Sequence, residues 1–307
     1  MTKISLTDTY TLTNGVTIPC IGYGLWQVPN DAKTVAVIGN ALKCGYRHLD
    51  TAAAYFNEES VGKAVQQSGI ARSELFITSK VWNSNRGYDK TIAAFEETLR
   101  KLQMDYLDLY LIHWPANEIW FANTGTVDDP IAGPYVPENK TPFANWQEVN
   151  TDTWKALETL YKQKRIRAIG VSNFLVHHLE SLKKRAEIAP MVNQIEFHPG
   201  YPQQETVNYC RKSGIVVEAW SPLGSGRMLA HPVLQEIAAK YSKSAAQICL
   251  RWCLQRDTLP LPKSVTEERI RENAAVFDFD ISAADMQRID TLPESGFSGF
   301  HPDKNNF

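Results

Sequence analysis

A length of 307 residues is enough for about two average domains, or for one α/β barrel of roughly 250 residues with extensions. The 32 basic and 34 acidic residues give a formal charge of −2, so the chain has no excess positive charge with which to bind a nucleic acid or an anionic membrane. A hydrophobic fraction of 43% with 21% charged residues excludes a largely disordered chain.

The predicted elements begin with a hairpin and continue as strands that alternate with helices. Asn14-Gly15 lies between β-forming residues and predicts a hairpin within residues 10–18. Short apolar runs then predict eight strands, at Ile21–Gly24, Tyr46–Asp50, Leu75–Lys80, Tyr106–His113, Ile166–Ser172, Met191–Ile195, Val216–Trp220 and Leu259–Leu261. Helical periodicity predicts helices at Asp31–Cys44, Glu58–Ser68, Tyr88–Leu102, Thr151–Gln163, His177–Ala186, Glu205–Ser213, Pro232–Tyr241, Ser244–Gln255 and Glu267–Phe277.

This alternation indicates a parallel sheet, and the even composition favours a single domain over residues 1–307. We therefore expect an α/β fold, a (β/α)8 TIM barrel with an N-terminal β-hairpin and a long loop after strand 4. A doubly wound open sheet is the alternative. Against it, the glycine pairs at 22–24 and 224–226 both lack the third glycine of a dinucleotide-binding turn.

The long loop runs from Ala116 to about Asn150. It contains glycines, prolines, asparagines and aromatic residues, and it is too long for an ordinary connection. In a barrel it would lie over the carboxyl-terminal mouth, where we expect a lid or a specificity loop.

The cysteines and the amino terminus indicate a cytoplasmic protein. Five cysteines are scattered along the chain, which is typical of free thiols in a reducing compartment. Cys249 and Cys253 lie within an apolar helical pattern that has no neighbouring metal-ligand cluster, so we expect them to pack in the core. The first ten residues lack the apolar core of a secretory signal, and no apolar run is long enough to cross a membrane.

Four ionisable side chains lie at or just beyond the ends of predicted strands. Asp50, Lys80 and His113 end the second, third and fourth strands, and Tyr55 follows Asp50 by five residues. In a barrel these side chains would meet at one mouth. Because facing aspartate and lysine keep each other charged, we expect the ammonium to lower the pKa of the adjacent tyrosine hydroxyl toward working pH.

Such a group suits a reaction in which negative charge develops on an oxygen. Tyr55 could donate a proton to a carbonyl oxygen as the carbon accepts hydride, and a neutral His113 could donate a hydrogen bond to the same oxygen. A glycoside hydrolase would instead pair Asp50 with Glu196 or Glu218, which we interpret as pocket-wall or structural residues.

A metal hydrolase is a further alternative, and it would need several converging ligands. Only His48, His113 and His198 lie at or near strand ends, so we expect no metal site. His48 shares a strand face with Asp50, and we interpret it as a buried, hydrogen-bonded histidine.

The segment Pro262–Asn273 predicts a nucleotide phosphate site, because it runs from the last strand into a helix that begins after Thr266. Backbone amides there, together with Lys263, Ser264 and Arg269, suit a phosphate monoester. The 2′-phosphate that distinguishes NADPH from NADH is such a group. The segment therefore favours NADPH as the cofactor.

The ends of strands five to seven could hold a nicotinamide ring. Ser172, Asn173 and Gln194 offer a hydroxyl and amides to its carboxamide, and Trp220 offers a flat face for stacking. An aromatic substrate pocket is expected from three tryptophans just beyond strand ends, Trp26, Trp82 and Trp114.

Seven stretches of the chain carry a family resemblance: Gly45–Tyr55, Ile77–Trp82, Leu109–Pro115, Ile169–Phe174, Asn193–Pro199, Ala219–Gly224 and Pro262–Asn273. In these stretches, the chain resembles the aldo-keto reductase superfamily. The tail at 296–303 is similar to that of its microbial diketogluconate-reductase and prostaglandin-F-synthase-like branch. The resemblance implies a (β/α)8 barrel with extended NADPH across its mouth, and a catalytic tetrad of Asp50, Tyr55, Lys80 and His113.

The resemblance also assigns cofactor contacts. It implies that the nicotinamide is held by Ser172, Asn173, Gln194 and Trp220, the pyrophosphate side by Ser221 and Leu223, the 2′-phosphate by Lys263, Ser264, Val265 and Arg269, and the adenine by Glu272 and Asn273. We expect a monomeric NADPH-dependent reductase of small aldehydes or ketones, with Tyr55 as general acid. The alternative from another class is an NADPH-binding sensor without important turnover.

Overall fold

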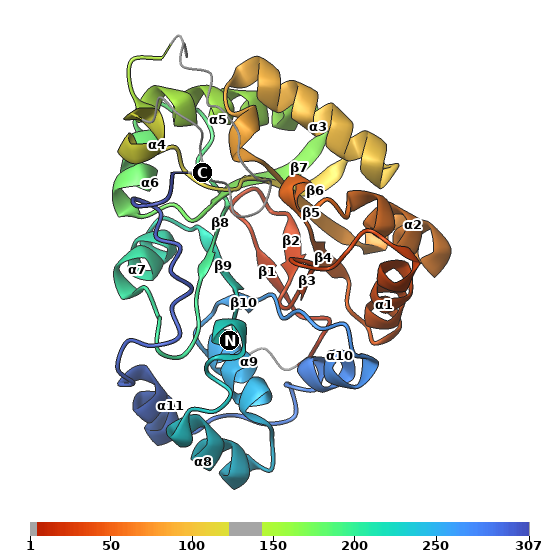
Figure 1. Ribbon diagram of the computed structural model, residues 1–307, viewed down its shortest axis with the longest axis vertical. Coiled ribbons are helices and arrows are strands. Elements are labelled where there is room, and N and C mark those ends of the chain that lie inside the picture. The colour runs from red at the N-terminus through yellow and green to blue at the C-terminus, as the bar shows by residue number, and fades with distance from the viewer. Residues whose placement is uncertain (1–4, 123–142, 307) are drawn as a thin grey trace.

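A computed structural model describes residues 5–122 and 143–306, and within them eight parallel strands form one sheet that curves around a barrel (Figure 1). Their hydrogen-bonded order follows the chain: β3 (Tyr23–Gly24), β4 (His48–Asp50), β5 (Phe76–Val81), β6 (Leu107–Ile112), β7 (Ile166–Ser172), β8 (Val192–Glu196), β9 (Val216–Trp220) and β10 (Leu259–Pro260). Two backbone hydrogen bonds of 3.0 Å join the ends of this order, from Gly22 N to Pro260 O and from Gly24 N to Pro262 O. They close the sheet, and the predicted (β/α)8 barrel is confirmed.

The closure between β3 and β10 needs glycine on the β3 side. A Cβ atom at Gly22 would lie 2.5 Å from the Leu261 side chain and 2.6 Å from the His48 ring. One at Gly24 would lie 3.0 Å from the Leu261 carbonyl oxygen. Because these contacts are shorter than or at the limit of van der Waals packing, a side chain at either position would push the two strands apart.

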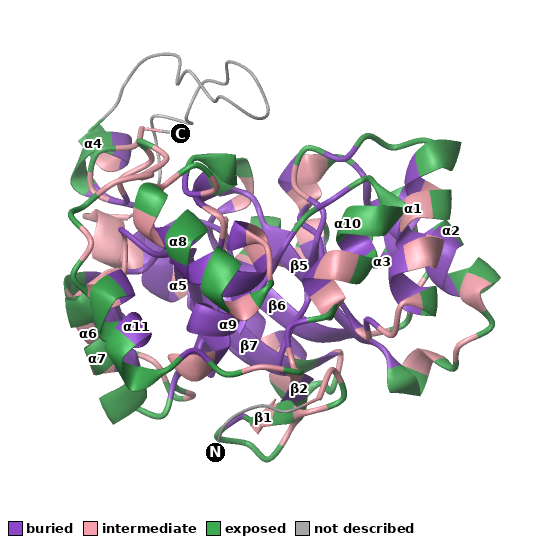
Figure 2. Ribbon diagram, turned by 90° about the horizontal axis from the view of Figure 1, so that it is seen from below, coloured by how far each residue is buried: buried purple, intermediate pink, exposed green. Residues whose placement is uncertain are grey.

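The predicted hairpin is also present, as β1 (Thr9–Thr11) paired antiparallel with β2 (Thr17–Pro19). Figure 2 shows it at one end of the barrel. The Asn14 side-chain amide donates to the carbonyl oxygen of Arg167 in β7 at 2.9 Å, near the amino-terminal end of that strand. Leu12 and Ile18 are buried. The hairpin therefore covers the end of the barrel opposite the predicted mouth.

Helices surround the strands (Figure 1), and the buried residues concentrate between the two layers (Figure 2). They are α1 (Ala32–Lys43), α2 (Glu58–Ser68), α3 (Tyr88–Leu102), α4 (Glu118–Ala122), α5 (Trp146–Lys162), α6 (Val176–Lys183), α7 (Gln204–Lys212), α8 (Pro232–Tyr241), α9 (Ala245–Gln255), α10 (Glu267–Ala274) and α11 (Ala283–Asp290). Every residue of β5 and β6 is buried, as expected for parallel strands covered on both faces.

Some helix boundaries differ from the predicted ones. The helix α5 begins before Thr151, because the Asn145 side chain accepts a hydrogen bond from Glu148 N at 3.0 Å and caps an earlier first turn. The helix α10 ends before Phe277. The helices α4 and α11 are both short and were not predicted. For α11, the signal in the sequence is Ser282, whose hydroxyl accepts from Asp285 N at 3.2 Å.

The long loop after the fourth barrel strand is only partly described. It begins with α4 and ends where α5 starts, and the predicted lid in between, at residues 123–142, lies outside the described residues. At its start, the Asn117 side-chain amide donates to the carbonyl oxygens of Pro302 at 2.6 Å and Asn305 at 2.8 Å. The beginning of the loop is therefore attached to the carboxyl-terminal tail.

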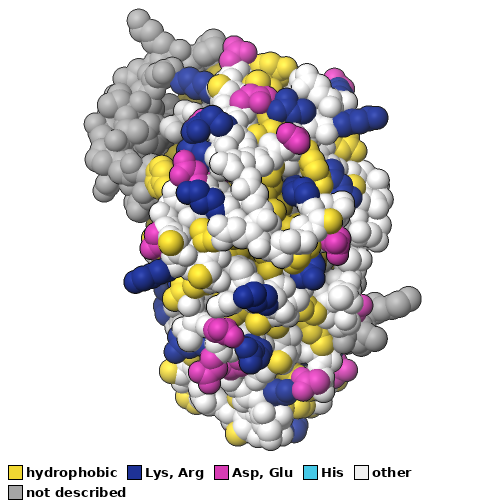
Figure 3. All heavy atoms as spheres, turned by 90° about the vertical axis from the view of Figure 1, so that its right-hand side faces the viewer, with side chains coloured by type: hydrophobic (Ala, Val, Ile, Leu, Met, Phe, Trp, Pro, Cys, Tyr) yellow, Lys and Arg dark blue, Asp and Glu magenta, His cyan; other side chains and the backbone are white. Residues whose placement is uncertain are grey.

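The surface carries mixed charge. Figure 3 shows one face on which basic and acidic side chains are interspersed rather than gathered by sign. Among the described helices, none is both long enough and apolar enough to span a lipid bilayer.

Candidate active site

The structure brings Asp50, Tyr55 and Lys80 together at the carboxyl-terminal end of the barrel. Asp50 ends β4, Lys80 lies near the end of β5, and Tyr55 ends the short 3₁₀ helix η1 (Ala53–Tyr55) that follows β4. The Lys80 ammonium donates to Asp50 Oδ1 at 2.7 Å, to the Thr51 carbonyl at 3.0 Å and to the Tyr55 hydroxyl at 3.5 Å. The lysine therefore connects the carboxylate to the phenol.

The Lys80 side chain is fully buried, yet it remains charged. Burial by itself would lower the pKa of the ammonium, but the charge and hydrogen bond of Asp50, with Tyr55 and Glu218 adding to them, outweigh burial and raise the pKa. Asp50 is only 3% exposed and forms the ion pair with Lys80. The predicted charged pair is present.

The expected lowering of the Tyr55 pKa is wrong. Burial of the phenol raises its pKa, the positive charge of Lys80 opposes this, and the Asp50 carboxylate adds to the increase. Burial wins because the Lys80 charge is already largely balanced by the nearer Asp50. Tyr55 is consequently a neutral phenol at ordinary pH, which is the form able to donate a proton.

His113 lies directly after β6, and its ring packs edge-on against Tyr55, with ring centroids 5.5 Å apart. It packs in the same way against Trp82, at 4.9 Å. Burial, and secondly the charge of Lys80, hold the pKa of His113 well below its usual range. The ring is therefore neutral, in agreement with the expected hydrogen-bond donor.

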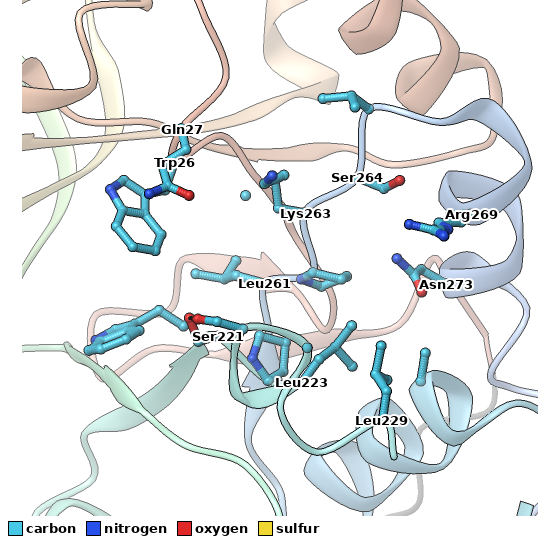
Figure 4. A pocket seen from close by; sticks show the side chains of 18 of the residues that line it. Trp26, Gln27, Ser221, Leu223, Leu229, Leu261, Lys263, Ser264, Arg269 and Asn273 are labelled. Carbon is cyan, nitrogen blue, oxygen red and sulfur yellow. Dashed lines mark hydrogen bonds between the residues drawn. The ribbon is translucent and has the colours of Figure 1, made fainter. Parts of the chain in front are cut away.

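A cavity of about 590 Å³ opens beside the tetrad and extends to α10 (Figure 4). Predicted site residues that line it are Trp26, Tyr55, His113, Trp114, Ser172, Asn173, Gln194, Trp220, Ser221, Leu223, Lys263, Ser264, Val265, Arg269, Glu272 and Asn273. Asp50 and Lys80 lie beneath its wall. Trp82 does not line the cavity. It is buried in a small cluster with Trp114, and its ring packs against that of His113.

The wall around Asn173 is held by internal hydrogen bonds. The Asn173 amide donates to the His113 carbonyl and to the Ser172 hydroxyl, each at 3.0 Å, and its carbonyl accepts from Trp220 Nε1 at 2.8 Å. The Ser172 hydroxyl donates to the Gln194 backbone carbonyl at 2.8 Å. These side chains fix the indole of Trp220 and the backbone of His113, so the cavity wall is formed in advance of any ligand.

The opposite end of the cavity has two basic residues, Lys263 and Arg269, and one acidic residue, Glu272. Lys263 lies in the loop before α10, and Figure 4 shows Arg269 and Asn273 extending from α10 toward the cavity, near Ser264. Across residues 5–122 and 143–306, neither Lys263 nor Arg269 forms an ion pair. The Ser264 hydroxyl accepts from Thr266 N at 3.1 Å and shapes the turn into the helix. This end is suited to an anionic group.

Several cavity residues were not predicted, among them Gln27, Leu229, Gln235 and Phe300. They lie in loops, in α8 and in the tail, where no strand end marks them in the sequence. Phe300 packs edge-on against Trp114, with ring centroids 6.4 Å apart.

The tail that carries Phe300 is fixed to the barrel by Glu196. Its carboxylate accepts from the Ser298 amide at 2.9 Å and from the Ser298 hydroxyl at 2.7 Å. The interpretation of Glu196 as a structural residue therefore agrees with its position.

A second tail contact contains ligand types that metals use. Nitrogen and oxygen atoms of His177, His178 and Asp303 lie within 4.8 Å of one another. However, His178 Nδ1 accepts a hydrogen bond from the Leu175 amide at 3.2 Å, so in the neutral ring Nε2 carries the proton, 3.3 Å from Asp303 Oδ1. A protonated nitrogen is no metal ligand, and the group instead connects α6 to the tail.

The mouth of this barrel brings a phenol next to a buried lysine and aspartate, and the adjoining cavity has basic residues at its far end. These features define a class of nucleotide-dependent oxidoreductases. The family model described as the Aldo/keto reductase family matches residues 20–294, and the chain is a member of this family. The resemblance noted in the sequence is confirmed.

Two relatives and one solved structure illustrate the similarity. The chain is 50% identical to the glyoxal reductase of Bacillus subtilis, with 98% of each chain covered. It is 39% identical to the methylglyoxal reductase DkgA of Salmonella typhimurium, over 95% of this chain and 96% of the relative. The structure of the Gox0644 D53A mutant in complex with NADPH superimposes with a TM-score of 0.84 at 38% identity, covering 98% of this chain and 99% of the other.

Proposed function

We propose that this protein reduces aldehydes and ketones to alcohols with NADPH, and that Tyr55 is the general acid. The observation that carries the proposal is the Lys80 ammonium, which contacts both the Asp50 carboxylate and the Tyr55 hydroxyl at the edge of the cavity. A phenol held beside a buried cation can release its proton as negative charge develops on a bound oxygen, because the cation stabilises the phenolate that remains.

The cavity residues fit NADPH. Lys263 and Arg269 offer cations and α10 offers its amino terminus at one end, where the 2′-phosphate would be held. Trp220 and Gln194 offer a flat ring and an amide at the other end, next to Tyr55. When bound, NADPH supplies the hydride that reduces the carbonyl carbon.

The chain's own residues have separate roles in this reaction. Tyr55 donates its proton to the carbonyl oxygen, and Lys80 stabilises the negative charge left on the phenol. Asp50 keeps the buried lysine charged and in place. The neutral His113 donates a hydrogen bond that orients the substrate oxygen.

The end of the cavity proposed to bind substrate is aromatic. Trp114 and Phe300 line the cavity and pack in one cluster with Tyr55, and Trp26 lines the cavity as well. An apolar wall of this kind favours carbonyl compounds with little charge. Two relatives are named as reductases of glyoxal and methylglyoxal, which are small 2-oxoaldehydes. We propose 2-oxoaldehydes as the first substrates to test.

The test is NADPH consumption, followed by absorbance, against a panel of 2-oxoaldehydes, aldehydes, ketones, keto esters and sugars, with NADH in parallel. Replacing Tyr55 by Phe removes the proton and keeps the ring, so we expect turnover to fall by about 10²- to 10⁴-fold. NADPH binding, measured by protein fluorescence, should be retained. A Tyr55→Phe variant with normal turnover would contradict the role of the phenol, and NADPH binding without turnover of any carbonyl would favour a sensor.

A further inference from the structure

Glu218 is a second buried carboxyl group beneath the tetrad, and the proposed reaction does not use it. It lies in the middle of β9 and is 0% exposed. Charged or titratable groups face it from two strands: His48 and Asp50 on β4, and Lys80 on β5. From its other neighbours, β8 presents the neutral Gln194 as its register partner, and β10 presents Leu259.

Both hydrogens of the Gln194 side-chain amide are taken by carboxyl oxygens. Gln194 Nε2 donates to Asp50 Oδ2 at 2.9 Å and to Glu218 Oε2 at 2.8 Å. If the amide turned over, its carbonyl oxygen would face the Asp50 carboxylate, which can only accept, and the amide hydrogens would lose both of these partners. The two carboxyl groups therefore fix the amide with its carbonyl oxygen toward the cavity that Gln194 lines.

The charges at this place do not balance if both carboxyls are ionised. Lys80 is the single cation that faces them among the described residues, because burial lowers the pKa of His48 to about 3 and keeps its ring neutral. Burial, and secondly the negative charge of Asp50, raise the pKa of Glu218 to about 8. Glu218 is consequently a neutral acid at pH 7, and Lys80 remains paired with Asp50 alone.

We propose that Glu218 is a positioning residue. In its neutral form it holds the Gln194 amide in the orientation that presents a hydrogen-bond acceptor to the cofactor, and its ionisation makes Tyr55, beside Lys80, a poorer proton donor. This inference depends on the proposed function for its second part. When Glu218 loses its proton at alkaline pH, a second negative charge faces Lys80. The ammonium then stabilises the Tyr55 phenolate less, and proton donation becomes slower.

Two variants separate the orientation of the Gln194 amide from the effect of Glu218 ionisation on Tyr55. Glu218→Gln keeps the size and an acceptor oxygen for Gln194 but cannot ionise. Glu218→Met keeps much of the volume and removes the acceptor. The matched control is Glu58→Gln: Glu58 is a buried acid of α2 that accepts from the Ser79 hydroxyl at 2.7 Å and lies outside the cavity lining.

The experiment measures the NADPH dissociation constant by protein fluorescence, and kcat for a 2-oxoaldehyde between pH 6 and about 10, which spans the ordinary tyrosine pKa. We expect Glu218→Met to bind NADPH about fivefold more weakly, the effect of one lost hydrogen bond. We expect the kcat of the wild type to decline near pH 8, where Glu218 ionises. Glu218→Gln should bind NADPH normally and lack this decline. Glu58→Gln should match the wild type in both measurements, even if it unfolds more easily.

The proposal is overturned if Glu218→Met binds NADPH within twofold of the wild type, or if the pH profile of Glu218→Gln coincides with that of the wild type. If Glu218→Met does not fold, the Glu218→Gln profile decides. NADPH binding needs no substrate, so a wild type that binds NADPH but reduces no carbonyl would contradict the proposed function while the binding comparison still tests Glu218.

Discussion

At the scale of single residues, Lys80 sets the charge balance of the site. Its ammonium is fully buried and contacts Asp50 at 2.7 Å. A buried carboxylate that loses its cation is strongly destabilising, by about 3–5 kcal/mol. We expect Lys80→Met to lower the free energy of unfolding by about this amount, measured with urea, and to abolish measurable NADPH consumption.

The double variant provides the control. Adding Asp50→Asn to Lys80→Met replaces the unpaired carboxylate by a neutral amide, so most of the lost stability should return while turnover stays absent. If the two substitutions were instead additive in stability, Asp50 and Lys80 would not act as a pair.

At the scale of elements, the carboxyl-terminal tail completes the aromatic end of the cavity. Glu196 holds Ser298, and Asn117 holds Pro302 and Asn305, so Phe300 is kept against Trp114 between two attachments. Because Phe300 lines the cavity and packs in the same aromatic cluster as Trp114 and Tyr55, we expect it to contact substrate rather than the phosphate end of the cofactor.

We expect Phe300→Ala to raise KM for an aromatic aldehyde by about tenfold, equivalent to about 1.4 kcal/mol of binding energy, and to leave the NADPH dissociation constant unchanged. Steady-state kinetics and fluorescence titration measure the two quantities. The control is Phe56→Ala, which removes an exposed ring that follows Tyr55 but does not line the cavity. Equal effects of both variants on KM would contradict a specific role of the tail.

Much of this arrangement could be predicted from the sequence because parallel strands end at the same edge. Asp50, Lys80 and His113 each follow an apolar run, and closing the barrel brings such positions together. The prediction of the phosphate end also relied on a local pattern, a strand followed by the start of α10.

The remaining features depend on contacts that leave no local pattern. Phe300 is held at the cavity because the tail donates a hydrogen bond to Glu196 and accepts one from Asn117, and both residues are distant from it in the sequence. Glu218 looks like any polar residue in a strand until Gln194 and Asp50 are placed around it. The sign of the Tyr55 pKa shift was missed because a sequence does not show how deeply a side chain is buried.

At the scale of the whole molecule, buried histidines make stability depend on pH. Burial lowers the pKa of His48 to about 3, and burial with the charges of His177 and His301 lowers that of His178 to about 3. Unfolded histidine titrates near about 6.5. Between these values the unfolded chain binds protons that the folded chain does not. The free energy of unfolding should therefore fall as the pH decreases below about 6.5, by about 1.4 kcal/mol per pH unit for each histidine.

Urea unfolding at several pH values tests this. His178→Gln should reduce the slope of unfolding free energy against pH by the contribution of one histidine. His231→Gln, at the residue that precedes α8, serves as the control, because His231 does not contribute to the His178 shift. Glu218 acts in the opposite direction: because its pKa is raised to about 8, its contribution is complete below its unfolded pKa and is lost as the pH increases toward 8. A slope below pH 6.5 that is the same in both histidine variants would contradict the assignment to His178.

The closure of the barrel between β3 and β10 has a consequence for biosynthesis. The tetrad is complete once the ribosome has passed His113, but Pro260 and Pro262, which accept the hydrogen bonds of Gly22 and Gly24, are translated near the end of the chain. Until then the nascent polypeptide presents β3 as an open edge, ready to pair with a neighbour. A message truncated before codon 259 would yield all four tetrad residues in a chain prone to aggregate.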